Sequence, residues 1–395
     1  MVKIDFDKQN PAEKTGYDMI YLIICSLHGI VPEQSKVEQM NLAALYNLSK
    51  KHGLTAMVCM PLDTVGVFST STDKDLVKKW KDAKEKAIRK NLMLDAERNE
   101  ILSYMDREGI WYLPLKGILL KEMYPKLGMR QMADNDILYD KRYQQELMQF
   151  MTARGYEPSQ IGKGNHDIYR KEPVYNFEMH TALYGAAHDK NWEAYYRNVK
   201  QRLRKDEGNR FGYHFREEDF YIYLLTHIYK HYRGSGTGIR SLLDIYVFLK
   251  DRRMKLNWHY IAVEMERLGI SEFEQESREL CIRLFSKEQY PITQREREIV
   301  AYYHSSGTYG TIENNVEHKL RKYQSDNEPI SAVTRLKYFY ARLIPDMDYY
   351  KNYVPFVYRH KILIPFYILF RVLRGLLRHR KLIQNELQAL NRIGR

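Results

Sequence analysis

The stretch WYLPLKGILLKEMYPKLGMRQMADNDILYD, residues 111–140, decides the fold. It opens with a short apolar run, turns at Lys116-Gly117 into a short helical pattern, and ends in a second apolar run that carries Asp134 and Asp136. This order predicts a strand, a helix and a second strand. Because residues two apart on a strand point to the same side, we expect the carboxylates of Asp134 and Asp136 to lie side by side.

This arrangement of residue types suits phosphate chemistry. Two adjacent carboxylates repel each other unless a cation lies between them, and Mg²⁺ takes oxygen ligands. A glycine that opens a helix lets phosphate oxygens approach backbone N–H groups, and Lys116 adds a positive charge beside Gly117. Together they form the minimum equipment for phosphoryl or nucleotidyl transfer. Taken singly, the carboxylate pair has a plainer interpretation as a solvated pair, and the glycine as a turn residue.

The chain around this stretch is mostly helical. Residues 67–108 contain no proline or glycine, and their apolar positions recur at helical spacing. This predicts one long helix over 75–107 that ends at Gly109, with a single break in it as the alternative. Further helices are predicted over 17–27, 37–51, 118–123, 141–153, 220–232, 239–250, 258–268 and 272–285. Strands are predicted over 110–115, 135–139 and 174–180. The fold class is therefore α+β, with a small mixed β-sheet core embedded in a mostly helical chain.

The length of 395 residues predicts more than one domain. We expect an N-terminal helical region at 1–73, an α+β core at 74–190, a helical domain at 191–304 and a C-terminal basic helical region at 305–395.

The motifs together resemble the uncharacterised nucleotidyltransferase family of the DNA polymerase β-like superfamily. In that family an apolar strand ends in Leu-Lys-Gly, and a Tyr-Pro, an Arg, an Asp-x-Asp strand, a Glu-x-His strand, a His-x-x-x-His helix and a helical Asp follow. The matching residues are Leu115-Lys116-Gly117, Tyr124-Pro125, Arg130, Asp134-Asn135-Asp136, Glu178-Met179-His180, His227, His231 and Asp244. The order and spacing of these motifs agree with those of the family over residues 41–249. The chain departs from the wider superfamily at Ile118, where Gly or Ser is usual, and at Asn135, where an apolar residue is usual.

The resemblance implies a nucleotidyltransferase core with a two-metal mechanism. A nucleoside monophosphate would pass from an NTP, with ATP as the favoured donor, to a hydroxyl of a small molecule, a sugar or a protein. Asp134, Asp136 and Glu178 would be the catalytic carboxylates and would hold two Mg²⁺ ions. Glu178 would either bind the second ion or take the proton of the acceptor hydroxyl. The plainer interpretation of Glu178 is an ordinary surface carboxylate.

The resemblance also implies binding roles for residues around the carboxylates. Lys116, Gly117 and Arg130 would bind the nucleotide phosphates, and a structural ion pair is the alternative for Arg130. A second set would line the acceptor or nucleobase side of the cleft, or brace the helical domain: His180, His227, His231, Arg240 and Asp244.

Two patterns in that second set have other interpretations. His227 and His231 have the i, i+4 spacing of metal ligands, but Ile228 stands where a zinc protease has glutamate, which argues against that class. Asp244 follows Arg240 by four residues, so an intrahelical ion pair is its plainer explanation.

Composition restricts the partner and the compartment. Lys and Arg number 63 against 50 Asp and Glu, a net charge of +13, which favours an anionic partner. The three cysteines lack CxxC spacing, which argues against a disulfide scaffold or a cysteine zinc site and favours a cytoplasmic location. The first ten residues show no signal-peptide core. No RNP, zinc-finger or helix-turn-helix signature is present, which argues against a nucleic-acid partner, although a nucleic-acid 3′-end transferase stays a third hypothesis.

The segment HKILIPFYILFRVLRGLLRHR at 360–380 is apolar on one side and basic on the other. Its continuous run of apolar residues is too short to span a bilayer. Two interpretations are open: a helix that lies peripherally on an anionic membrane surface, or a terminal helix that packs its apolar stripe on the protein core. The first supports an alternative function, a non-catalytic adaptor that keeps the fold and binds an anionic polymer or a membrane surface.

Overall fold

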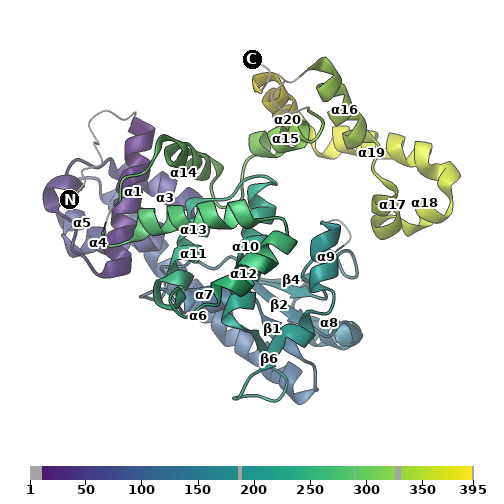
Figure 1. Ribbon diagram of the computed structural model, residues 1–395, viewed down its shortest axis with the longest axis horizontal. Coiled ribbons are helices and arrows are strands. Elements are labelled where there is room, and N and C mark those ends of the chain that lie inside the picture. Colours follow the sequence, from purple (N-terminus) through teal and green to yellow (C-terminus); the bar gives the residue numbers. More distant parts are fainter. Residues whose placement is uncertain (1–10, 186–188, 289, 325–330, 394–395) are drawn as a thin grey trace.

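The computed structural model describes residues 11–185, 189–288, 290–324 and 331–393, and its architecture is α+β (Figure 1). Its larger sheet has the strand order β1-β2-β5-β4-β3. The strands are β1 (Tyr112–Pro114), β2 (Asn135–Tyr139), β3 (Glu157–Ser159), β4 (His166–Lys171) and β5 (Tyr175–His180). The β2–β5 pair is parallel and the other three pairs are antiparallel. The predicted small mixed sheet within a mostly helical chain is therefore confirmed.

Helices surround this sheet and make up most of the remaining chain. Before and within the sheet lie α1 (Pro11–His28), α2 (Gln34–Val37), α3 (Leu42–Lys51), α4 (Thr55–Thr64), α5 (Val67–Thr70), α6 (Lys74–Arg107), α7 (Lys116–Lys121), η2 (Lys141–Tyr143) and α8 (Gln144–Ala153). After it lie α9 (Lys190–Tyr196), η3 (Val199–Arg202), α10 (Glu217–Tyr232), α11 (Ile239–Arg252), α12 (Trp258–Arg267), α13 (Ser271–Phe285) and α14 (Gln294–Ser306). The C-terminal helices are α15 (Ile312–Arg321), α16 (Ala332–Leu343), α17 (Met347–Tyr353), α18 (Pro355–Arg359), η4 (Lys361–Leu363), α19 (Ile364–Arg378) and α20 (Arg380–Arg392). Two short strands, β6 (Leu203–Lys205) and β7 (Tyr213–Phe215), form a separate hairpin-like sheet.

The long helix α6 begins and ends at local signals in its sequence. The side chain of Asp73 accepts a hydrogen bond of 2.9 Å from the N–H of Leu76, which caps the first turn. Gly109 follows the helix with φ +73°, a conformation that favours glycine. The single helix predicted over 37–51 is instead two helices, because Asn41 caps a new helix by accepting a hydrogen bond from the N–H of Ala44.

The two faces of the sheet pack against different helices. One face, with Ile137 and Phe177, forms a core with α6 and α8. The other face presents Leu138 to the larger core built by the N-terminal helices and α10–α14. Because side chains alternate along a strand, Asp136 and Glu178 lie on this second face, toward the α10 side.

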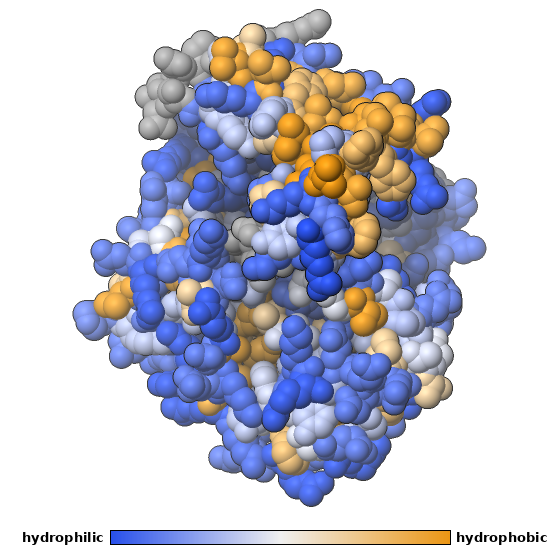
Figure 2. All heavy atoms as spheres, turned by 90° about the vertical axis from the view of Figure 1, so that its right-hand side faces the viewer, coloured by the Kyte–Doolittle hydropathy of each residue, from blue (hydrophilic) through white to orange (hydrophobic). Residues whose placement is uncertain are grey.

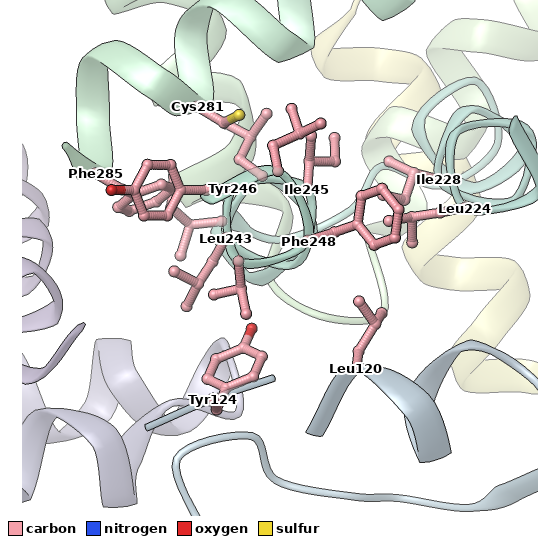
Figure 3. Packing of buried hydrophobic residues seen from close by; sticks show 14 of the residues in the cluster. Leu120, Tyr124, Leu224, Ile228, Leu243, Ile245, Tyr246, Phe248, Cys281 and Phe285 are labelled. Carbon is pink, nitrogen blue, oxygen red and sulfur yellow. The ribbon is translucent and has the colours of Figure 1, made fainter. Parts of the chain in front are cut away.

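The larger hydrophobic core joins segments that are distant in sequence. It includes residues of α1, α4, α6, the sheet and α10–α14. Figure 3 shows Leu120 and Tyr124, which follow the first strand, directed at α11 and its neighbour α10, where Leu243 and Ile228 lie. This packing fixes α7 and the following loop against the helices that close the candidate site.

The C-terminal helices have a small core of their own. Val316 and Leu320 of α15 pack with Tyr338, Ala389 and Leu390. No residue of α19 is buried, so the apolar stripe of residues 360–380 does not pack on the protein core, contrary to one of its two interpretations. Across the described ranges, none of the helices is long and apolar enough to cross a membrane.

Candidate active site

Three carboxylates converge on two neighbouring inner strands of the sheet, where β2 begins. Asp134 directly precedes β2, Asp136 is its second residue, and Glu178 on β5 is the direct partner of Asp136 in the parallel pairing. Oxygen atoms of the three side chains all lie within 4.8 Å of one another. The amide of Asn135 points to the opposite side, where it donates to the carbonyl of Leu94 on α6 at 3.3 Å.

Burial and mutual repulsion make this cluster costly without a cation. Burial, followed by the charges of Asp136 and Asp134, raises the pKa of Glu178 to about 7. Burial and the charge of Asp136 also raise the pKa of Asp134 above its usual value. Three oxygen donors whose negative charges oppose one another are a ligand set suited to Mg²⁺.

Asp136 is held in its charged form by two neighbours. Nζ of Lys116, the first residue of α7, lies 3.4 Å from its Oδ2. Nε2 of His180, at the end of β5, lies 3.2 Å from its Oδ1. Burial opposes the charge on Asp136, but attraction to Lys116 and the hydrogen bond with His180 outweigh burial and keep its pKa well below the usual range.

His166 joins the site from β4, a strand that the sequence did not predict. It is the cross-strand partner of His180, and the two rings lie 4.9 Å apart. Its Nε2 lies 3.6 Å from Oε2 of Glu178. Burial, reinforced by His180, lowers the pKa of His166 to about 4, so the ring is neutral at physiological pH. His166, Glu178 and His180 therefore form a second group that could hold a metal ion, and it shares Glu178 with the first.

Helix α10 packs over the face of the sheet that carries the carboxylates and covers the site from there. Nζ of Lys116 donates to Nε2 of His227 at 2.5 Å. Nε2 of His231 lies 3.2 Å from Nε2 of His227. Burial and the nearby charge of Lys116 lower the pKa of His227 well below its usual value. Burial and Lys116 also lower the pKa of Lys230 to about 8. Lys116 thus links the carboxylates of the sheet to the histidines of α10.

Arg130 and Asp244 form a buried ion pair, and the charge of Arg130 also acts on Asp134. Nε and Nη2 of Arg130 each donate to one oxygen of Asp244 at 2.8 Å, and the hydroxyl of Tyr124 donates to Oδ1 at 2.7 Å. A third guanidinium nitrogen, Nη1, lies 3.1 Å from Sδ of Met132. These contacts favour the structural interpretation of Arg130, and they pair Asp244 with Arg130 rather than with Arg240.

Gly117 allows a close approach in the same region. A Cβ atom at this position would lie 3.1 Å from Nη1 of Arg130 and 3.1 Å from Cε of Met132. Space for this packing is a sufficient reason for a glycine after Lys116, whether or not its N–H contacts phosphate.

A basic cleft of about 530 Å³ lies beside Asp134. Nζ of Lys90 donates to the carbonyl of Ala133 at 3.0 Å, and Nη1 of Arg240 donates to the carbonyl of Gln131 at 3.2 Å, so both cations sit next to the loop that leads to Asp134. Its lining includes one acidic residue, Asp82, and six basic ones: Lys50, Lys51, Lys79, Lys86, Lys90 and Arg240. We call this surface the basic cleft.

The sequence analysis named Arg240, for the acceptor or nucleobase side, but none of the lysines of the basic cleft. Lys79, Lys86 and Lys90 are spaced seven and four residues apart on α6, which places them on one helix face. That spacing was a usable signal. The approach of Lys50 and Lys51 from the end of α3 depends on tertiary packing and had no local signal.

Comparison with known proteins gives one match. A family model described as an uncharacterised nucleotidyltransferase matches residues 38–286, which is more than half of the chain. Neither the curated proteins nor the solved structures gave a match.

Proposed function

Because this chain belongs to the uncharacterised nucleotidyltransferase family, we propose that it transfers a nucleoside monophosphate from an NTP to a hydroxyl group in a Mg²⁺-dependent reaction. ATP is the favoured donor, and the acceptor hydroxyl belongs to a small molecule, a sugar or a protein. The observation that carries the proposal is the convergence of Asp134, Asp136 and Glu178 within 4.8 Å.

The donor set fits magnesium. Asp134 and Asp136 would hold two ions, with Glu178 as a further ligand or as the base, because these carboxylates repel one another and the positive charges of Lys116, Arg240 and Arg130 offset that repulsion only in part. When bound, Mg²⁺ would neutralise the cluster and stabilise negative charge on the attacking and leaving oxygens.

The acceptor proton has a candidate base. The acceptor oxygen would form a bond to the α-phosphorus, the bond from that phosphorus to the bridging oxygen would break, and pyrophosphate would leave. Glu178 would take the hydroxyl proton, since its pKa of about 7 suits a base at neutral pH. The alternative for Glu178 is to act as a metal ligand, with the proton leaving to solvent.

For the phosphates we propose the basic cleft together with Lys116. Lys90 and Arg240 of the cleft lie next to the loop that leads to Asp134, and the positive charges that line the cleft complement a triphosphate. Arg130 would instead position α7 and α11, because its guanidinium is already bound by Asp244. His180, His227 and His231 would line the acceptor side. The cytoplasmic location expected from the sequence stays a prediction; the three cysteines are free and buried.

A thermal-shift screen of the four NTPs, each with and without Mg²⁺, tests the proposal. The Asp134→Asn/Asp136→Asn variant is the matched control. A ligand at ~100-fold over its Kd should stabilise the wild type by about 2.7 kcal/mol. We expect this stabilisation to need both Mg²⁺ and the two aspartates.

The rival function is a non-catalytic adaptor that binds an anionic polymer or a membrane surface. No stabilisation by any NTP, or equal stabilisation of the double variant, would favour the adaptor over the enzyme.

A further inference from the structure

Exposed apolar side chains gather on the C-terminal helices. Among the described residues, 26 large apolar side chains are exposed, and 18 of them lie between residues 333 and 387. Figure 2 shows this concentration as an orange area on the face that carries the C-terminal helices, above a largely hydrophilic remainder. A contiguous exposed apolar surface of this kind marks an interaction site.

Helix α19 presents the most regular part of that surface. Its exposed apolar residues are separated by three, one, three, three and one positions, so they follow one face of the helix. They are Phe366, Leu369, Phe370, Leu373, Leu376 and Leu377, and their exposed fractions run from 48% to 74%. We call this surface the apolar face of α19. An ordinary amphipathic helix buries such a face, whereas here none of the residues of α19 is buried.

Positive charge flanks the apolar face. Arg374 and Arg378 are exposed on the neighbouring side of α19, whereas the guanidinium of Arg371 on that side lies over the ring of Tyr349, and the helix has no acidic residue. Over residues 331–393 the sequence has twelve Lys and Arg against three Asp and Glu. An apolar face bordered by arginines is the arrangement of helices that lie in the interface of an anionic bilayer, where the arginines reach the headgroups.

The helix is held in place by the rest of the C-terminal unit. Ala389 and Leu390 of α20 are buried against α15, and Glu386 of the same helix accepts hydrogen bonds from Tyr338 and Arg342 of α16. Helix α19 precedes α20 directly, so it is presented on a packed support. With 15 residues it is ~22 Å long, shorter than the ~30 Å of a bilayer core, which fits a surface orientation.

From these observations we propose that the C-terminal helices dock this protein on an anionic phospholipid bilayer, with the apolar face of α19 at the acyl boundary. Charge decides between a bilayer and a second copy of the chain. Two copies would bring two strongly basic surfaces together, which is repulsive, whereas anionic lipid attracts each Lys or Arg near the surface by ~1 kcal/mol. The docking is independent of nucleotidyl transfer and does not rest on the proposed function.

Vesicle co-sedimentation of the full-length protein tests the docking. We compare vesicles of phosphatidylcholine alone with vesicles of equal parts phosphatidylcholine and phosphatidylglycerol. We expect binding to the anionic vesicles to exceed binding to the neutral ones by about tenfold or more, and to weaken in high salt. An equal or absent association with both kinds of vesicle would overturn the proposal.

Paired variants locate the contact. Leu369→Glu/Leu373→Glu changes two exposed positions of the apolar face and should reduce anionic-vesicle binding about tenfold or more, with an unchanged melting temperature. Met254→Glu is the matched control, because Met254 is 90% exposed and lies outside the C-terminal helices. Asp134→Asn should bind vesicles as the wild type does. A wild-type dimer in light scattering that becomes monomeric in Leu369→Glu/Leu373→Glu, without vesicle binding by either protein, would assign the face to self-association instead.

Discussion

Asp136 and Glu178 are direct partners in the parallel pairing of β2 and β5, and their carboxylates lie on the sheet face that looks toward α10. The register that pairs them also pairs Asn135 with Phe177 on the opposite face, in the core with α6. A slip of one residue would send one carboxylate into that apolar core. The buried packing of the other face therefore holds the acidic cluster together.

The ion pair of Arg130 and Asp244 should be a stability determinant. Arg130→Ala leaves a buried carboxylate without its partner, so we expect the free energy of unfolding to fall by about 3–5 kcal/mol. Urea unfolding of Arg130→Ala, Asp244→Ala and the double variant measures this decrease in the free energy of unfolding. The decrease in the double variant should be smaller than the sum of the decreases in the two single variants. A variant of Arg130 with unchanged stability and weakened nucleotide binding would restore its role as a phosphate ligand.

The basic cleft should control nucleotide affinity. Loss of a hydrogen bond to a charged group costs about 1.5–3 kcal/mol, so Lys90→Ala should weaken NTP binding by roughly tenfold to a hundredfold. Lys78→Ala is the matched control, since Lys78 is exposed on the same helix outside the cleft. Calorimetric titration with a non-hydrolysable NTP analogue compares them. Equal NTP affinities of Lys90→Ala and Lys78→Ala would show that the phosphates bind outside the basic cleft.

Metal binding should depend on pH through Glu178. Its pKa is raised to about 7, so below that pH the carboxyl holds a proton that a metal must displace. The apparent affinity for Mg²⁺ should therefore fall as the pH decreases from about 8 to about 6, by up to tenfold per unit. In Glu178→Gln this dependence should be absent, although overall affinity is lower. A wild type whose affinity is constant over that range would show that Glu178 is not a ligand.

Stability in mild acid should depend on His52. Its Nδ1 accepts from the N–H of Ile239 and its Nε2 donates to the carbonyl of His304, so the buried ring is neutral. Burial, followed by repulsion from the ring of His304, lowers the pKa of His52 to about 3. In the unfolded chain the His52 ring binds a proton below about pH 6.5, whereas in the folded protein it stays neutral. The contribution of neutral His52 to the free energy of unfolding is therefore complete above pH 6.5 and is lost as the pH falls toward 3.

At pH 5 the loss should be about 2 kcal/mol relative to neutral pH. His52→Gln keeps a donor and an acceptor without the titration. Its unfolding free energy should decrease less between neutral pH and pH 5 than that of the wild type. Parallel pH profiles for the two proteins would refute a neutral buried His52.

The parts of the fold with strong local patterns could be predicted from the sequence. The period of α6 and its ends at Asp73 and Gly109 define a 34-residue helix, and the apolar run of β2 occurs where the structure has it. The acidic pair was readable because alternation fixes the side of a strand on which Asp136 lies.

What sequence reasoning missed depends on long-range pairing. Strand β4 has the polar sequence HDIYRK, and it becomes a strand because β5 and β3 pair with both of its edges. His166 enters the site through that pairing. The partner of Asp244 was also missed, because the local rule suggests Arg240 at four residues, whereas Arg130 comes from 114 residues away.

Mn²⁺ binding followed by electron paramagnetic resonance tests whether Asp134, Asp136 and Glu178 form a metal centre, with Mn²⁺ as the spectroscopic substitute for Mg²⁺. Wild type and Asp136→Asn are titrated in the presence of a non-hydrolysable ATP analogue, and Asp140→Asn is the control because Asp140 pairs with Arg142 at the other end of β2. We expect Mn²⁺ binding that Mg²⁺ displaces, with affinity reduced about tenfold or more in Asp136→Asn and unchanged in Asp140→Asn. Equal Mn²⁺ affinity in all three proteins, or no bound Mn²⁺ in the wild type, would contradict the assignment of the three carboxylates as a metal centre.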